Sequence, residues 1–316
     1  MKPDGPYLRL QFAALLAMIV SPVSFADTPA ADTAAAVNHD NHPAQATEEY
    51  GRRIMRYTAR YIGPESEDPA MRYAGNRLSC SSCHLEVGAT PGTLSLLPSA
   101  AKYPRDSARD GGMRDLRDRI NGCMERSMNG RPLPRDSVEI IAMERYMLGL
   151  NAQYQAMSES ERVADEGSPF IEPDRAANVE AGRMIFETRC HVCHGDDGSG
   201  LRAPADPADG YLFPPLWGPD SYNNGAGMTR VLKAARFIKA RMPLAQENLT
   251  NDQAYDVAAF INSHPRPIKS NLEVDFPNKS RKPVDCPYPP YADDFPQEQH
   301  RLGPFKPIRE HYKSGE

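Results

Sequence analysis

Two short stretches decide the fold of this chain: CSSCH at residues 80–84 and CHVCH at residues 190–194. In a Cys-x-x-Cys-His motif, both thiols form thioether bonds to a haem and the adjacent histidine binds its iron. The motif occurs twice, each time after a predicted helix and before a loop. We therefore predict two covalently bound haem c groups (iron), attached through Cys80, Cys83, His84, Cys190, Cys193 and His194.

Zinc binding is the competing interpretation of the two motifs. A structural zinc site needs further Cys or His ligands in pairs, and the surrounding sequence offers none. His191, inside the second motif, is interpreted as a spacer residue.

The segments around the motifs predict an all-α chain of two cytochrome c-type haem domains, at 47–156 and 176–265. A polar linker at 157–175 joins them, and an extended Pro-rich tail at 266–316 is expected to wrap over a domain. Hydrophobic spacing and helix-breaking residues predict helices at 48–61, 113–128, 138–150, 176–188, 228–240 and 251–263.

The N-terminus predicts export. A basic start and an apolar run at 10–20 precede the small residues Ser24 and Ala26, which is typical of a cleavable signal peptide at 1–26. Left uncleaved, the same run would tether the protein instead. We expect a flexible lead-in at 27–46, a periplasmic location and no membrane span in the mature chain. A net charge of -5 gives no indication of nucleic-acid binding.

The ligand opposite each histidine decides whether a haem carries electrons or does chemistry. For the second haem we predict Met242, which follows a helix and precedes a proline, with Met228 and Lys239 as rivals. A neutral thioether favours Fe(II) and raises the reduction potential, which suits electron transfer.

The first haem has a more reactive candidate ligand. Cys123 lies on one face of a predicted helix with Arg119 and Ser127, and its thiolate could bind the iron. A buried thiol or a disulfide with Cys286 is the alternative interpretation, and the residues alone leave both open.

Three longer segments are similar to the dihaem thiosulfate dehydrogenases. They are DRINGCMERSMNG at 118–130, FPPLWGP at 213–219 with GAGM at 225–228, and FIKARMPL at 237–244. The resemblance covers about residues 50–265. It implies an enzyme that couples two thiosulfates to tetrathionate and passes two electrons to a periplasmic acceptor such as a small cytochrome c.

The resemblance also implies roles for individual residues. The first haem becomes the active site, with His84 and Cys123 as axial ligands and a substrate pocket formed by Arg109, Arg119 and Ser127. The second haem, between His194 and Met242, becomes the exit for electrons.

One position departs from the family. Arg241 stands where some relatives carry a lysine that can bind the second haem, and an arginine stays protonated and is a poor iron ligand. Met242 is therefore expected to be the ligand in both redox states.

Three other functions compete with this one. They are a non-catalytic dihaem electron carrier, a tetrathionate reductase working in the reverse direction, and a sulfur oxidoreductase acting on a carrier protein. An inert carrier would have no need of a cysteine among arginines.

Overall fold

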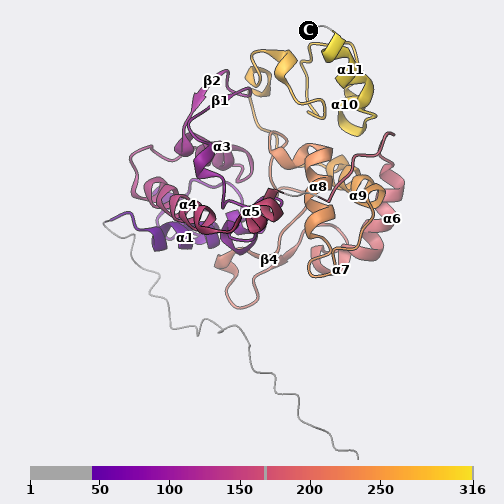
Figure 1. Ribbon diagram of the computed structural model, residues 1–316. Coiled ribbons are helices and arrows are strands. Elements are labelled where there is room, and N and C mark those ends of the chain that lie inside the picture. The colour runs from indigo at the N-terminus through magenta and orange to yellow at the C-terminus, as the bar shows by residue number, and fades with distance from the viewer. Residues whose placement is uncertain (1–44, 167–168, 315–316) are drawn as a thin grey trace, which may run out of the picture. The chain divides into compact units, whose positions relative to one another are not determined.

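A computed structural model describes residues 45–166 and 169–314, which belong to one compact unit (Figure 1). The predicted signal peptide, 1–26, and nearly all of the lead-in, 27–46, lie outside the described residues. The described chain is mostly helical, as predicted. Among its helices, none combines the length and the apolar character needed to cross a bilayer.

The first domain is built on four helices: α1 (Glu48–Arg56), α2 (Thr58–Ile62), α3 (Leu116–Arg126) and α4 (Val138–Ala156). The predicted helix at 48–61 is in fact two, because Tyr57 leaves the helical conformation at φ -125° and ψ 49°. Helices α1 and α4 pack together and form most of the core of this domain.

Helix α3 starts later than predicted. Residues just before it form a small antiparallel hairpin, β1 (Arg105–Ser107) with β2 (Gly112–Arg114), which the sequence analysis did not predict. The side chain of Asp115 then accepts a hydrogen bond from the Asp118 amide at 3.0 Å and caps the first turn of α3.

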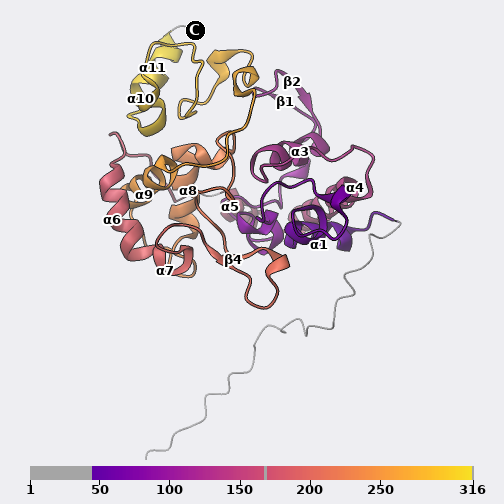
Figure 2. The ribbon, with the colours of Figure 1, turned by 180° about the vertical axis from the view of Figure 1, so that it is seen from behind.

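The second domain repeats this plan with α6 (Val179–Arg189), α7 (His191–His194), α8 (Val231–Arg241) and α9 (Asn251–Ser263) (Figures 1 and 2). Helix α9 has the predicted bounds, and Thr250 caps it by accepting from the Gln253 amide at 3.1 Å. A second hairpin joins β3 (Leu201–Arg202) to β4 (Tyr211–Phe213).

Short 3-10 helices fill the loops, and one of them carries the first three residues of the CSSCH motif. They span Pro69–Met71, Cys80–Ser82, Leu85–Gly88, Ala100–Lys102, Pro207–Asp209, Gly227–Thr229, Leu272–Val274 and Lys279–Arg281.

The linker and the tail are more structured than predicted. Helix α5 (Glu159–Glu166) lies in the linker, and the tail ends in α10 (Gln297–Leu302) and α11 (Lys306–Ser314). The tail is therefore not extended throughout. Its last part does wrap over a domain, because Phe305 and Ile308 are buried in the core of the second domain.

Polar contacts connect the two domains. Arg60 on α2 binds Asp209 of the second domain at 2.8 Å and also pairs with Asp206. Arg241 at the end of α8 donates to the carbonyl oxygen of Pro91. These contacts bring the two Cys-x-x-Cys-His motifs into one connected region.

Candidate active site

The histidines of the two motifs are held in the same way. His84 Nδ1 lies 2.7 Å from the Leu94 carbonyl oxygen, and His194 Nδ1 lies 2.8 Å from the Pro214 carbonyl oxygen. A carbonyl can only accept, so each Nδ1 carries the proton and each Nε2 is left to bind a metal. Burial lowers the pKa of His84 to about 4 and also lowers that of His194, so both rings are neutral.

A cavity of about 470 Å³ lies over the first motif. The structure brings every residue predicted for the first site to its wall: Cys80, Cys83, His84, Arg109, Arg119, Cys123 and Ser127. These residues come from the motif, from the β1–β2 hairpin and from α3. The cavity therefore collects side chains that lie far apart in the sequence.

Cys123 adds a third thiol to this wall, from α3. Arg119, one helical turn earlier on α3, donates from Nη1 to Cys123 Sγ at 2.8 Å. The negative charge of a deprotonated Cys123 raises the pKa of Arg119 further. This geometry places a positive charge directly beside the Cys123 sulfur.

The alternative disulfide between Cys123 and Cys286 does not form. Every cysteine in the described part of the chain is free, and Cys286 is buried in a separate cluster of the tail. That cluster is made of Leu272, Phe276, Cys286 and Tyr288.

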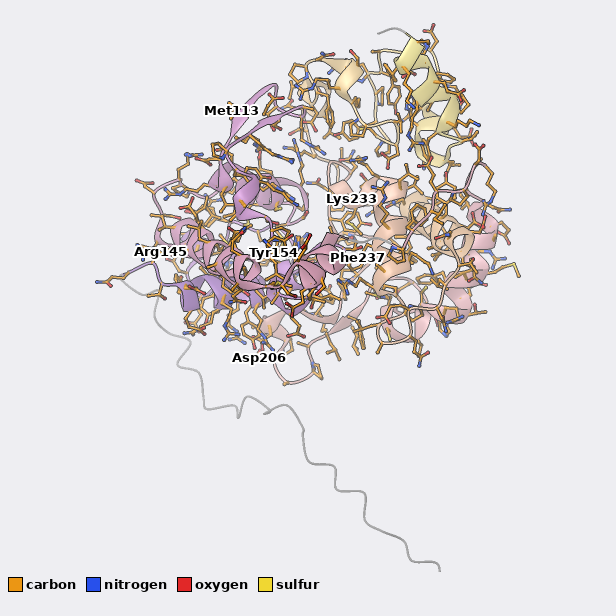
Figure 3. All side chains as sticks on the ribbon, in the orientation of Figure 1. Met113, Arg145, Tyr154, Asp206, Lys233 and Phe237 are labelled. Atoms are coloured by element: carbon orange, nitrogen blue, oxygen red, sulfur yellow. The ribbon has the colours of Figure 1, made fainter. Side chains whose placement is uncertain are left out.

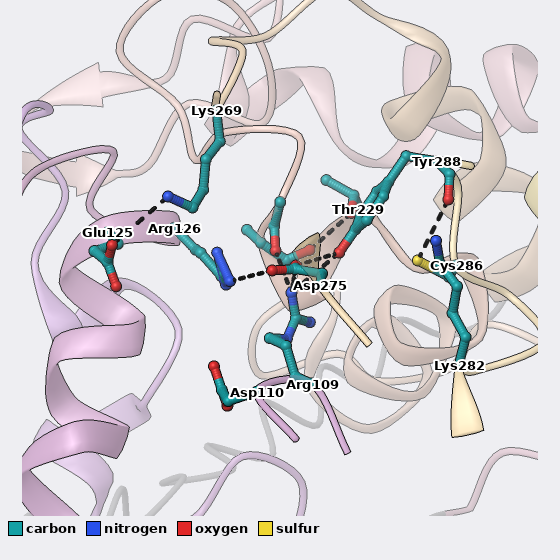
Figure 4. A network of polar contacts seen from close by, with 12 residues as sticks. Arg109, Asp110, Glu125, Arg126, Thr229, Lys269, Asp275, Lys282, Cys286 and Tyr288 are labelled. Atoms are coloured by element: carbon teal, nitrogen blue, oxygen red, sulfur yellow. Dashed lines mark hydrogen bonds and ion pairs between the residues drawn. The ribbon is translucent and has the colours of Figure 1, made fainter. Parts of the chain in front are cut away.

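Arg109 is in place, but a tail residue holds it (Figure 4). Its Nη1 donates to Asp275 at 2.8 Å and to the Tyr288 hydroxyl at 3.1 Å. Arg126 on α3 donates to the other oxygen of Asp275 at 2.8 Å. Sequence reasoning left Arg126 without a definite role and missed Asp275, because nothing in the sequence near Asp275 indicates which arginines it meets.

Arg126 also carries a hydrogen-bond donor that has no partner. Arg126 lines the cavity, and its Nη1 is buried and makes no hydrogen bond to any described residue. A buried donor of this kind costs about 1–3 kcal/mol when it is unsatisfied. An anionic group in the cavity, such as a haem propionate or a substrate oxygen, would satisfy it.

A second cavity, of about 260 Å³, lies over the second motif. Cys190, Cys193, His194 and Met242 all line it, as the predicted ligand set requires. Of the rival ligands, Lys239 donates instead to the Leu249 carbonyl oxygen at 2.7 Å. The other rival, Met228, lines both cavities.

The residues present fit haem c at both places. Each cavity has a pair of thiols and a neutral histidine with a free Nε2. A further sulfur side chain, Cys123 in the first cavity and Met242 in the second, could supply the second iron ligand. Zinc fits less well, since no cluster of three or more His, Cys, Asp or Glu that could hold a metal occurs among the described residues.

The two cavities have a common wall. Leu78, Cys83, Tyr222 and Met228 line both of them. Groups bound in the two cavities are therefore close neighbours, which is the arrangement that electron transfer between them needs.

Known protein families match the chain over both motifs. Residues 72–156 match the family described as SoxA/TsdA, cytochrome c domain, and residues 179–265 match the cytochrome c family. The chain is 42% identical over 226 residues to a thiosulfate dehydrogenase of Allochromatium vinosum, covering 69% of this chain and 80% of that protein. A thiosulfate dehydrogenase of Stutzerimonas stutzeri is 37% identical over 240 residues, covering 76% and 75%.

A solved structure is also similar. It is the thiosulfate dehydrogenase (TsdBA) of Marichromatium purpuratum in its as-isolated form, with a TM-score of 0.61 and 31% sequence identity. The match covers 71% of this chain and 47% of that one, so the chain spans about half the length of that solved chain.

Proposed function

The chain belongs to the family of dihaem thiosulfate dehydrogenases, and on that basis we propose that it couples two thiosulfates to tetrathionate in the periplasm. As a member, it is a thiosulfate-oxidising cytochrome c oxidoreductase with covalently bound haem c. Our proposal adds four points to this assignment. The product is tetrathionate, the number of haems is two, the signal peptide at 1–26 directs export, and a small periplasmic cytochrome c accepts the electrons.

A single contact carries the proposal: Arg119 Nη1 lies 2.8 Å from Cys123 Sγ on the wall of a cationic cavity. An electron carrier needs only inert ligands. A sulfur held beside an arginine is suited to react with a sulfur-containing anion.

The charge of the substrate explains why the site is cationic. Thiosulfate is a dianion, and two of them repel each other strongly at short range away from bulk water. The chain as a whole carries a net charge of -5, so attraction has to be local. Arg109, Arg119 and Arg126 supply it at the cavity wall, and Ser127 adds a hydroxyl beside them.

Cys123 would perform the coupling in two steps. Its thiolate forms a bond to the outer sulfur of one thiosulfate, and two electrons are released. The outer sulfur of the second thiosulfate then attacks the bound one. This breaks the bond to Cys123, yields tetrathionate and restores the thiolate, so atoms and charge balance.

The haems supply the electron acceptors when they are bound, one electron to each iron. His84 and Cys123 would hold the first, and His194 and Met242 the second. The wall shared by the cavities gives electrons a short path outward. In this scheme 47–156 is the catalytic domain and 176–265 the electron-transfer domain, joined by the linker at 157–175.

Replacing Cys123 with Gly tests the proposal. With thiosulfate as donor and ferricyanide as acceptor, the wild type should form one tetrathionate for every two thiosulfates, and Cys123→Gly should form none. Cys286→Ala is the matched control, because it removes a cysteine that lies outside the cavity, in the tail cluster. It should keep full activity.

Spectroscopy separates loss of chemistry from loss of haem. Cys123→Gly should keep both haems attached and lose the low-spin, thiolate-ligated signal in electron paramagnetic resonance. If it retains near-normal turnover, the role of Cys123 is wrong. If the wild type reduces tetrathionate but does not oxidise thiosulfate, the direction is reversed.

A further inference from the structure

Most of the arginines around the first cavity already have carboxylate partners. Asp275 pairs with Arg109 and Arg126 at 2.8 Å each. Asp285 likewise pairs with Arg230 at 2.6 Å, from a fully buried position in the tail. Each carboxylate offsets positive charge that would otherwise attract a dianion.

The same applies to Arg114, which lines the cavity and pairs with Asp110 at 3.0 Å. Arg119 has no carboxylate partner in the part of the chain that the structure describes, but its Nη1 is engaged by the Cys123 sulfur. The arginines therefore leave less free positive charge in the cavity than their number suggests.

Three further cations line this cavity and have no carboxylate partner among the described residues: Lys102, Arg105 and Lys233. Lys102 and Arg105 are exposed, whereas Lys233 is half-buried. Lys233 lies on α8 in the second domain, and Figure 3 labels it where that helix faces the first domain. Its side chain lines the first cavity, although it comes from the other domain. Among the described residues, no carboxylate lies within ion-pair distance of its Nζ, whereas Lys269 and Lys306 each have such a partner.

The fold makes room for this side chain at Gly227. A Cβ atom on Gly227 would lie only 3.3 Å from Lys233 Nζ and 3.4 Å from its Cδ. The absence of a side chain at 227 thus lets the aminoalkyl chain of Lys233 lie against the backbone. Gly227 itself also lines the cavity.

The charged side chains that act on Lys233 are mostly cationic. Burial and, after it, the positive charges of Arg119 and Arg230 lower its pKa to about 8. A deprotonated Cys123 acts in the opposite sense and favours the ammonium form. A bound dianion would supply the charge that this ammonium group is missing.

On the function proposed above, we infer that Lys233 binds the sulfonate group of one of the two thiosulfates. The substrate site is then assembled from both domains: Arg119 and Cys123 from α3, and the ammonium of Lys233 from α8. Asp275 offsets only one of the two positive charges of Arg109 and Arg126, and Lys233 adds a further positive charge for the two dianions. An ammonium group suits this role, because its three donors rotate freely to meet sulfonate oxygens.

The test compares Lys233→Met, Lys233→Arg and the wild type, all loaded with haem. Lys239→Met is the matched control, because Lys239 is on the same helix but donates to the Leu249 carbonyl oxygen. Calorimetry measures the dissociation constant of thiosulfate for the fully reduced enzyme, which has no oxidised haem to turn the substrate over. Steady-state kinetics and the reduction potentials of both haems are measured on the same samples.

We expect Lys233→Met to bind thiosulfate about 10-fold or more weakly, the usual size for a lost charge-assisted hydrogen bond. KM should rise more than kcat falls, both haem potentials should stay unchanged, and Lys233→Arg should recover most of the binding. Lys239→Met should bind like the wild type.

Two outcomes would overturn the inference. One is wild-type affinity for thiosulfate in Lys233→Met. The other is a shifted first-haem potential with unchanged affinity, which would make Lys233 a partner of a haem propionate. A different result would refute the proposed function: the wild type forms no tetrathionate from thiosulfate.

Discussion

The carboxylate of Asp275 should be one of the strongest polar anchors in this protein. It accepts from Arg109 and Arg126 at 2.8 Å each and from the Tyr288 hydroxyl at 2.7 Å (Figure 4). Its side chain is only 4% exposed, and the two arginines are 20% and 13% exposed. The change to test is Asp275→Ala.

The burial of these groups sets the magnitude. Removing one partner of a buried ion pair leaves an uncompensated charge and typically costs about 3–5 kcal/mol of stability. We expect Asp275→Ala to lower the free energy of unfolding by about that amount, since it leaves two buried arginines without their carboxylate partner. Changing Arg126 to Met in the same protein should recover part of the loss, because one stranded charge is then gone.

A matched control lies on the same tail. Arg281 pairs with Asp106 of the β1–β2 hairpin at 2.5 Å, but these side chains are 47% and 53% exposed. Exposed pairs contribute about 0–1 kcal/mol, so Asp106→Ala should have little effect. Asp106→Ala breaks a contact between the tail and the same hairpin but leaves no buried charge without a partner.

Urea unfolding of the haem-loaded variants, followed by circular dichroism, measures the difference. The Soret absorbance of each variant, recorded beforehand, checks that both haems are present. Equal losses for Asp275→Ala and Asp106→Ala would refute the reasoning. So would a loss below about 1 kcal/mol for Asp275→Ala, the range of an exposed pair.

Two further predictions concern the second domain. Met242→Ala should remove the sulfur ligand from the second haem and lower its reduction potential, measured by spectroelectrochemistry; an unchanged potential would point to Met228. Phe305→Ala should destabilise the protein by about 3–5 kcal/mol in urea unfolding, because the ring is buried in the core of the second domain. Ile268→Ala, at a side chain that is 83% exposed, should stay within about 0.5 kcal/mol of the wild type, and equal effects would contradict the burial argument.

Local patterns predicted the helices well where caps and spacing are strong. The helix at 251–263 has the predicted bounds, because Thr250 and Gln253 form a capping box within four consecutive residues. The hairpins were missed because β1 and β3 are too short for alternation to show. The helices of the tail were missed because α10 and α11 have only six and nine residues, and helices so short depend on tertiary packing.

The sequence by itself predicted the haem attachment sites and the candidate reactive sulfur. Both Cys-x-x-Cys-His motifs, and the helical face that joins Arg119 to Cys123, depend on spacings of a few residues that any short helix reproduces.

Only the tertiary structure decided how positive charge is distributed in the first cavity. Asp275 offsets Arg109 and Arg126 from the tail, and Lys233 enters from the second domain without a carboxylate partner among the described residues. Contacts between residues so far apart depend on how the domains and the tail pack. No local pattern encodes that packing, and so a count of arginines in the sequence could not predict which charges remain free to bind an anion.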